Sequence, residues 1–246
     1  MNVLVACEES QRVCIAFRER GHRAFSCDIQ ECSGGHPEWH IQGDVLPLLN
    51  GNCTFQTADT QTHAQDGRWD LIIAHPPCTY LTVAGNSWFD VEKYGEKAIK
   101  RLQDREDAVA FFMRFATSKC NHIAIENPVG VISTRYRKPD QIIQPFMFGH
   151  PYTKQTCLWL KGLPILKPTD VLQRPPGGWE NEQITEDGRY GGFGGKWGCN
   201  QDGKWYRYGD PEVSRIRSRT FPGVASAMAD QWGDPDNCEI QLELEL

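Results

Sequence analysis

Residues 70–85 constrain the fold of this chain more than any other stretch of its sequence. Leu71–Ala74 is an uninterrupted apolar run, which is typical of a strand buried on both faces of a parallel sheet. Pro76 and Pro77 end this strand, because a proline nitrogen cannot donate a hydrogen bond to a neighbouring strand. Cys78 follows at once, so its thiol is predicted to lie at the carboxyl edge of the sheet, where such sheets bind ligands.

The order of residues in this stretch resembles the catalytic loop of the DNA cytosine-5 methyltransferases, which reads Pro-Pro-Cys-Gln-x-Phe-Ser-x-x-Gly. Here Thr79 replaces the glutamine, Leu81 the phenylalanine and Thr82 the serine, while the glycine is kept as Gly85. The resemblance implies that Cys78 is the nucleophile and that Thr79, Thr82 and Gly85 lie against the substrate. The alternative for Cys78 is a buried, inert thiol, as most cysteines outside disulfides are.

A strand–helix–strand unit opens the chain. Val3–Ala6 reads as a buried strand, residues 12–20 as a helix stopped by Gly21, and residues 24–27 as a second strand that ends at Asp28. This unit predicts an α/β protein with a doubly wound, mostly parallel sheet, in which the acidic residue binds a ribose. The resemblance narrows the expected fold to the Rossmann-like class I of methyltransferases that use S-adenosylmethionine.

The loop of residues 7–11 lacks the glycines of a dinucleotide-binding turn and carries Glu8 and Glu9 instead. Two carboxylates repel a pyrophosphate, so the loop disfavours NAD and FAD and permits a cationic sulfonium cofactor. The resemblance implies S-adenosylmethionine, with Asp28 on its ribose, Ile29 packed on its adenine and Asp44 at the adenine amino group; for Asp44 a plain surface turn is the alternative. The other residues expected to bind the cofactor are Ala6, Cys7, Glu8, Ser10, Val45, Pro76 and Val224.

Two later motifs extend the resemblance. An apolar run ends in Glu126-Asn-Pro, which resembles the family's Glu-Asn-Val and implies that Glu126 protonates the cytosine ring while Asn127 orients the catalytic loop. The run that begins at Gly149 resembles the family's Gly-x-Pro-Gln-x-Arg-x-Arg, with Lys154 and Thr156 in place of the two arginines. Lys154 supplies a point charge without a planar fork, so it is expected to stabilise charge on the base or a phosphate, with Thr156 as a substrate contact.

Two stretches between these motifs have a plainer interpretation. Residues 96–119 predict a long amphipathic helix with one apolar face. That face is expected to consist of Ala98, Leu102, Ala108, Phe111, Phe112 and Phe115. Residues 50–68 are polar and are expected to be irregular, with no assigned role.

The segment after residue 163 changes to proline, glycine and aromatic residues. Between residues 188 and 219 seven basic residues stand against three acidic ones, a local charge of +4 in a chain whose net charge is −6. Interleaved aromatics suit stacking on nucleic-acid bases, and a loop folded on its own aromatics is the alternative. Arg215, Arg217 and Arg219 are expected to bind DNA, and Arg217-Ser-Arg-Thr-Phe-Pro resembles a closing motif of the family that leads into a helix.

The resemblance runs from Val3 to Trp232 and indicates a compact, divergent, phage-type member. We expect residues 1–162 to form the catalytic and cofactor-binding α/β domain, 163–213 a small recognition segment rich in glycine and aromatics, and 214–246 a C-terminal helix that returns to the catalytic domain. Residues 239–246 read as an edge strand or a loose tail.

Composition indicates a cytoplasmic protein, in the host cytoplasm if the gene is carried by a phage. Hydrophobic residues make up 39% of the chain, no apolar run approaches the roughly 18 residues of a membrane span, and no signal peptide is expected. The ten cysteines are expected to be reduced. Cys27, Cys32, His36 and His40 have a spacing compatible with zinc, but Asp28 lies among them and is better explained by the cofactor, so no metal site is predicted.

The function that follows from the resemblance is methyl transfer from S-adenosylmethionine to carbon 5 of cytosine in DNA, through a covalent Cys78 adduct and with low sequence specificity. Cytosine in a duplex would have to be flipped out to reach Cys78. One alternative keeps the Cys78 and Glu126 chemistry but acts on RNA or a free nucleotide, or uses a modified sulfonium donor. Another is a nucleic-acid-binding module without catalysis. The sequence leaves single- or double-stranded DNA and the oligomeric state open.

Overall fold

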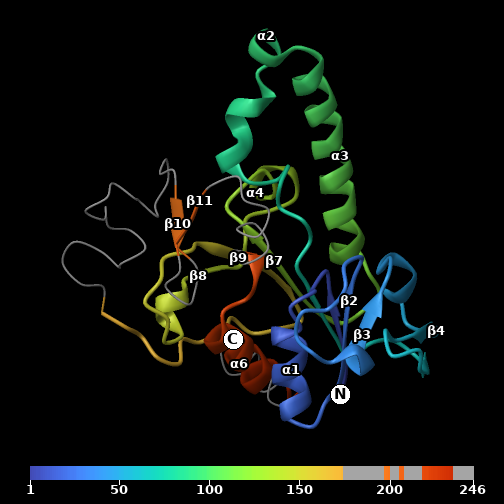
Figure 1. The fold of residues 1–246 in the computed structure, drawn as a ribbon. Coiled ribbons are helices and arrows are strands. Elements are labelled where there is room, and N and C mark those ends of the chain that lie inside the picture. Colours follow the sequence, from blue (N-terminus) through green and yellow to red (C-terminus); the bar gives the residue numbers. More distant parts are fainter. Residues whose placement is uncertain (174–196, 200–204, 208–217, 235–246) are drawn as a thin grey trace.

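A seven-stranded sheet forms the centre of the computed structural model, which describes residues 1–173, 197–199, 205–207 and 218–234 (Figure 1). The strands of this sheet are β1 (Asn2–Ala6), β2 (Arg23–Asp28), β3 (His40–Gln42), β6 (Leu71–Ala74), β7 (His122–Pro128), β8 (Gln141–Ile143) and β9 (Thr156–Lys161). Their order is β3-β2-β1-β6-β7-β9-β8, and β9 runs in the direction opposite to the other six strands of this sheet. The predicted α/β fold with a mostly parallel sheet is therefore confirmed.

The order of the strands fixes where this sheet can bind a ligand. From β1 the chain first builds β2 and β3 on one side and then returns to place β6 on the other side. The connections that follow β1 and β6 therefore diverge to opposite sides and leave a crevice at their carboxyl ends. The sequence places the loop of residues 7–11 after β1 and the His75-Pro-Pro-Cys segment after β6, so both border this crevice.

Helices cover both faces of the sheet (Figure 1). Val3 and Val5 pack with α1 (Arg12–Glu19) and α6 (Pro222–Trp232), whereas Leu4 and Ala6 belong to the core on the other face, with α3 (Glu96–Ala116). Successive residues of a strand point to opposite faces, so a strand covered on both sides must be apolar throughout. This explains the continuous apolar runs in β1 and β6.

Helix α1 ends where the sequence predicts. Gly21 has a φ of 81°, in the left-handed region that glycine adopts readily, and its amide donates to the carbonyl of Arg18. Arg20 then joins α1 to α6, because its Nε lies 2.5 Å from Oδ1 of Asp230 and its guanidinium donates to Ser226. The helix expected around residues 224–229 is thus α6, packed against α1.

The expectation that residues 50–68 are irregular is wrong. They contain an antiparallel hairpin of β4 (Cys53–Gln56) and β5 (Thr62–Gln65). Phe55 supplies the reason, because it is buried between two exposed neighbours and its ring lies edge-on to Phe25, with centroids 5.0 Å apart. A single buried aromatic in a polar run is a weak sequence signal, and the surface of β2 decides that it forms a strand.

The apolar face predicted for the long helix is only partly buried. Ala98, Phe112 and Phe115 are buried, but Leu102 is 40% exposed. The N-terminal half of α3 extends beyond the sheet together with α2 (Val91–Tyr94), as Figure 1 shows, so Leu102 has no sheet beneath it. The part of the predicted apolar face that carries Leu102 is therefore exposed.

Short elements complete the described chain. They are η1 (Pro37–Trp39), η2 (Leu46–Leu48), η3 (Val83–Phe89), α4 (Ile132–Arg135), η4 (Pro145–Met147) and a separate antiparallel pair of β10 (Trp197–Cys199) and β11 (Trp205–Arg207). Among the helices of the described residues, none combines the length and apolar character required to span a bilayer. The expected tail at 239–246 and most of the predicted recognition segment lie outside the described residues.

Candidate active site

Three ionisable side chains come from the carboxyl ends of three adjacent strands. Glu8 follows β1, His75 follows β6, and Glu126 lies within β7. The registers pair Ala6 with Ala74 and Ala74 with Ile125, so His75 and Glu126 each directly follow a paired residue at the same edge of the sheet, and Glu8 follows Ala6 by two residues at that edge. The edge that borders the crevice therefore carries a carboxylate, an imidazole and a second carboxylate.

His75 and Glu126 form an ion pair in this row. Nδ1 of His75 lies 3.2 Å from Oε2 of Glu126, and both side chains are largely buried. Burial acts to lower the pKa of His75, but the carboxylates of Glu126 and Glu8 outweigh burial and leave that pKa raised. Burial acts to raise the pKa of Glu126, but His75 and Lys154 outweigh burial and lower that pKa. Both shifts favour the charged form of the pair, with a proton on the imidazole and none on the carboxylate.

Glu8 has a structural partner at the start of α1. Its Oε1 accepts a hydrogen bond from the amide of Val13 at 2.7 Å, and its Oε2 accepts one from the amide of Cys14 at 3.2 Å. Burial raises the pKa of Glu8, although His75 and these two amides act to lower it. Because the carboxylate satisfies the amides that would cradle a phosphate, this helix start is closed to a pyrophosphate.

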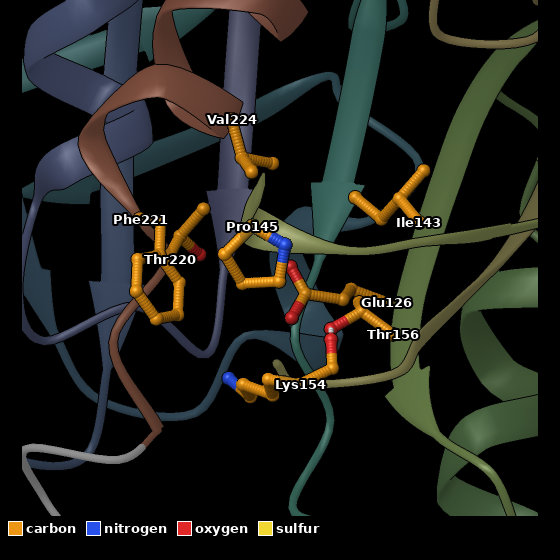
Figure 2. Close-up of a pocket in the computed structure, with 8 residues that line it drawn as sticks. All are labelled: Glu126, Ile143, Pro145, Lys154, Thr156, Thr220, Phe221 and Val224. Carbon is orange, nitrogen blue, oxygen red and sulfur yellow. Dashed lines mark hydrogen bonds between the residues drawn. The ribbon is translucent and has the colours of Figure 1, made fainter. Parts of the chain in front are cut away.

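A pocket opens beside Glu126 and collects side chains from distant parts of the sequence (Figure 2). Its lining consists of Glu126, Ile143, Pro145, Lys154, Thr156, Thr220, Phe221 and Val224. Figure 2 shows the carboxyl group of Glu126 beside Pro145, facing the side of the pocket where Thr220 and Phe221 lie, with the Lys154 side chain below it in this view. The structure thus brings together Glu126, Lys154, Thr156 and Val224, which the sequence assigned to three separate motifs.

The loop that carries Cys78 is fixed to the strand that carries Glu126. Nδ2 of Asn127 donates to the carbonyl of Pro76 at 2.8 Å, and both residues are buried. Cys78 is exposed two residues later, at the carboxyl edge of β6. This hydrogen bond joins the loop to β7, and the role of Asn127 in orienting the loop for catalysis stays a prediction.

The residues after Cys78 are held by α3. Arg101 donates to the carbonyl of Thr79 at 3.3 Å, and Arg105 donates to the carbonyl of Tyr80 at 2.9 Å. Thr82 accepts a hydrogen bond from the amide of Ala84 and begins η3, and Gly85 lies buried against Arg101. Thr79 is exposed beside the thiol; the substrate contacts of Thr79, Thr82 and Gly85 stay predictions.

Gly130 joins this loop to the end of β7. Thr82 and Gly130 pair as an antiparallel bridge, and the amide of Val131 donates to the carbonyl of Leu81 at 2.9 Å. A Cβ added at Gly130 would overlap that carbonyl oxygen and lie 3.1 Å from the Cα of Thr82. The close approach of two backbones, rather than an unusual φ, therefore requires glycine here.

We expect Gly130→Ala to destabilise the protein by about 1–3 kcal/mol, because the added methyl group forces the two loops apart. Thermal unfolding followed by circular dichroism checks this, with Gly43→Ala as the matched control. A Cβ at Gly43 meets no atom within 4 Å, so the control is expected to change the free energy of unfolding by less than about 0.5 kcal/mol. Equal stability of the two variants would contradict the tight contact.

The predicted cofactor residues lie at the ends of β2 and β3. Asp28 ends β2 and accepts a hydrogen bond from the amide of Gln30, and Ile29 is 78% exposed. Asp44 is exposed and accepts a hydrogen bond from the amide of Leu46, and Val45 is buried. An exposed isoleucine between two carboxylates suits a ligand with an apolar ring and hydrogen-bond donors.

The remaining predicted cofactor positions lie nearer the sheet. Ala6 points its side chain into the core, while its carbonyl accepts from the amide of His75. Cys7 has a φ of 59°, and its amide donates to the carbonyl of Cys27. Ser10 and Pro76 are buried. Only a ligand that reaches backbone atoms can therefore contact Ala6, and the cofactor roles stay predictions.

Arg219 packs against the loop that follows β1. Its Nε lies 3.6 Å from Oε1 of Glu9, and its guanidinium donates to the hydroxyl of Ser33 at 3.1 Å. The nearby Arg12 donates to the carbonyl of Thr220. These contacts join the closing segment to the first loop, and the predicted binding of DNA by Arg219 stays a prediction. Arg215 and Arg217 lie outside the described residues.

The spacing considered for zinc does not produce a metal site. His40 is buried between the hydroxyl of Ser26 and the carbonyl of Gln30, and the thiol of Cys27 contacts the carbonyl of Gly43. Within the part of the chain that the structure describes, no three histidine, cysteine or acidic side chains gather around a common point.

Two residues of the site, His75 and Thr220, were not predicted from the sequence. His75 directly precedes Pro76 at the end of a buried strand, and an ionisable residue in that place was a usable signal. Thr220 carried no such signal, because it reaches the pocket only through the packing of α6 against α1.

Comparisons with known proteins give a distant structural likeness. No protein-family model and no curated protein matches the sequence. Among solved structures, the chain is similar to an Escherichia coli protein encoded within a prophage and assigned as a DNA modification methyltransferase. The TM-score is 0.40 and the sequence identity 16%, over 71% of this chain and 52% of that one. The present chain thus matches about half the length of that protein.

Proposed function

We propose that this protein methylates carbon 5 of cytosine in DNA, with S-adenosylmethionine as the donor and with little sequence discrimination. The observation that carries the proposal is the convergence of the Cys78 loop, Glu126, Lys154 and the closing segment at one edge of the sheet. The sequence resemblance to cytosine-5 methyltransferases rests on these same segments, in which Cys78 and Thr220 are 142 positions apart. Because the fold brings these segments to one edge of the sheet, it supports the proposal that they form one site.

The residues at the ends of β1, β2 and β3 fit a sulfonium cofactor better than a dinucleotide. Glu8 closes the helix start to phosphate, and Asp28 and Asp44 add negative charge around the exposed Ile29. We assign Asp28 to the ribose, Ile29 to the adenine and Asp44 to the adenine amino group. S-adenosylmethionine supplies an electrophilic methyl group when it is bound.

The chain's own residues solve the central chemical difficulty, which is that carbon 5 of cytosine is a weak nucleophile. The Cys78 thiolate adds to carbon 6, and N3 of the ring takes a proton from Glu126, so that carbon 5 becomes an enamine carbon. Lys154, which lines the same pocket, stabilises negative charge on the base or on a neighbouring phosphate. Asn127 keeps the Cys78 loop against the strand of Glu126.

Mass spectrometry of nucleosides tests this proposal. The purified protein is incubated with methyl-labelled S-adenosylmethionine and, in separate reactions, duplex DNA, single-stranded DNA, RNA or free cytidine nucleotides. We expect label in 5-methylcytosine from DNA. Label on an exocyclic nitrogen, or in no substrate, would overturn the proposal, and label in RNA or nucleotides alone would move the same chemistry to another substrate.

A further inference from the structure

The row of Glu8, His75 and Glu126 contains an imidazole that the proposed mechanism does not use. His75 is largely buried, and its Nε2 makes no hydrogen bond with any described residue. Oε2 of Glu126 likewise has only the 3.2 Å ion-pair contact with Nδ1 of His75. A buried polar atom without a hydrogen-bond partner lowers the stability of the folded protein. The presence of such atoms beside a predicted catalytic acid therefore points to a function.

The charges around His75 come from every side of the row. Glu126 faces it from β7, Glu8 from the loop after β1, and Lys154 from the segment before β9. Two carboxylates favour the imidazolium and one lysine opposes it. Glu8 is already bound to the amides of Val13 and Cys14, so Glu126 is the carboxylate that remains available to exchange a proton.

The resting state of this pair conflicts with the chemistry assigned to Glu126. Protonation of cytosine requires a proton on the carboxyl group, yet the contact with His75 and the charge of Lys154 favour the carboxylate. The proton that the reaction needs is present in the pair, but it is held by the imidazole. A transfer across one short contact resolves the conflict.

We propose that His75 is a positioning residue that stores the proton for Glu126 and returns it when the base is bound; this inference rests on the proposed function. When the base is bound, the proton on Nδ1 of His75 first crosses the 3.2 Å contact to the Glu126 carboxylate. In the addition step the Sγ–C6 bond forms, the electron pair of the C5–C6 double bond moves into the C4–C5 bond, and the pair of the C4–N3 double bond moves onto N3. N3 takes the proton from Glu126, which returns to the carboxylate. The thiolate and the imidazolium are both neutralised, so charge balances.

Hydrogen–deuterium exchange at carbon 5 of cytosine measures this step without a methyl donor, because the enamine formed by Cys78 addition takes a deuteron from the solvent. We expect His75→Gln to slow exchange about 10–100-fold above neutral pH. At acidic pH Glu126 protonates directly from solvent, so the variant should return to within about 3-fold of wild type. The quantity compared is the ratio of the wild-type exchange rate to the His75→Gln exchange rate at each pH. Titration of the Cys78 thiol affects both rates alike and does not change this ratio.

His122→Gln is the matched control, because His122 begins β7, the strand of Glu126, and its Nδ1 lies 3.1 Å from the carbonyl of Asp70 at the opposite edge of the sheet. It should leave the exchange rate unchanged. If the ratio of wild-type to His75→Gln exchange rates does not vary with pH, His75 has a structural role alone and the inference is overturned.

Nuclear magnetic resonance of ¹⁵N-labelled histidine tests the pairing independently of activity. The His75 signals, identified by their loss in His75→Gln, should titrate at least about one pH unit lower in Glu126→Gln than in wild type. An unchanged titration would overturn the inference while leaving the proposed function standing. If the wild-type protein catalyses no exchange at carbon 5, the proposed function and the proposed proton transfer are both wrong. The titration of the His75 signals then reports on the ion pair with Glu126 alone.

Discussion

Cys78→Ser should abolish methyl transfer, with a fall of at least about 10³-fold in the rate of 5-methylcytosine formation. A serine hydroxyl is not ionised near neutral pH and is a much weaker nucleophile than a thiolate, so the addition to carbon 6 fails. Because Cys78 is exposed at the end of its loop, the substitution should leave the thermal unfolding temperature unchanged. Mass spectrometry of nucleosides measures the rate.

Cys53→Ser is the control for this variant, because Cys53 is a half-buried thiol in the β4–β5 hairpin, away from the crevice. It should retain wild-type activity. The covalent step is measured separately, by trapping on an oligonucleotide that contains 5-fluorocytosine. Wild type should form an adduct of the summed mass, and Cys78→Ser should form none. Methylation that persists in Cys78→Ser would indicate direct attack by an exocyclic amino group, which needs no thiol.

Glu126→Gln should slow methyl transfer about 10²–10⁴-fold, because the amide keeps the shape of the side chain but carries no transferable proton. Unlike His75→Gln, this variant should not recover at acidic pH, since no carboxyl group is left to protonate. Glu92→Gln, an exposed residue of α2, is the control and should be fully active. Activity of Glu126→Gln within about 3-fold of wild type would contradict the assigned role.

The same variant should change how stability depends on pH. The raised pKa of His75 contributes stability that is complete below the ordinary histidine pKa and is lost as pH rises through the raised value. The lowered pKa of Glu126 contributes stability that is complete above its ordinary pKa and is lost as pH falls through the lowered value. The difference in unfolding free energy between wild type and Glu126→Gln should therefore be largest at pH values above the ordinary pKa of glutamate and below the ordinary pKa of histidine. Urea titrations across that range measure it.

Local patterns were sufficient for much of the sheet. The apolar runs of β1, β6 and β7 were predicted because a strand covered on both faces must be apolar at every position. The burial of Phe55 and the exposure of Leu102 were not predicted, for one shared reason. The burial of each side chain depends on whether another element covers it. Neighbouring residues in the sequence reveal neither the hairpin's contact with Phe25 nor the extension of α3 beyond the sheet.

For the site, local patterns in the sequence were enough to predict which groups are available: a thiol after two prolines, a carboxylate at a strand end and a lysine after a glycine turn. The thiol follows a strand end for a local reason, because a proline nitrogen cannot donate a hydrogen bond to a neighbouring strand. The ion pair of Glu126 with His75 and the place of Thr220 in the pocket lining become visible in the folded protein alone. The interaction of charges depends on distance and burial, and both are set by strand order and helix packing rather than by position in the chain.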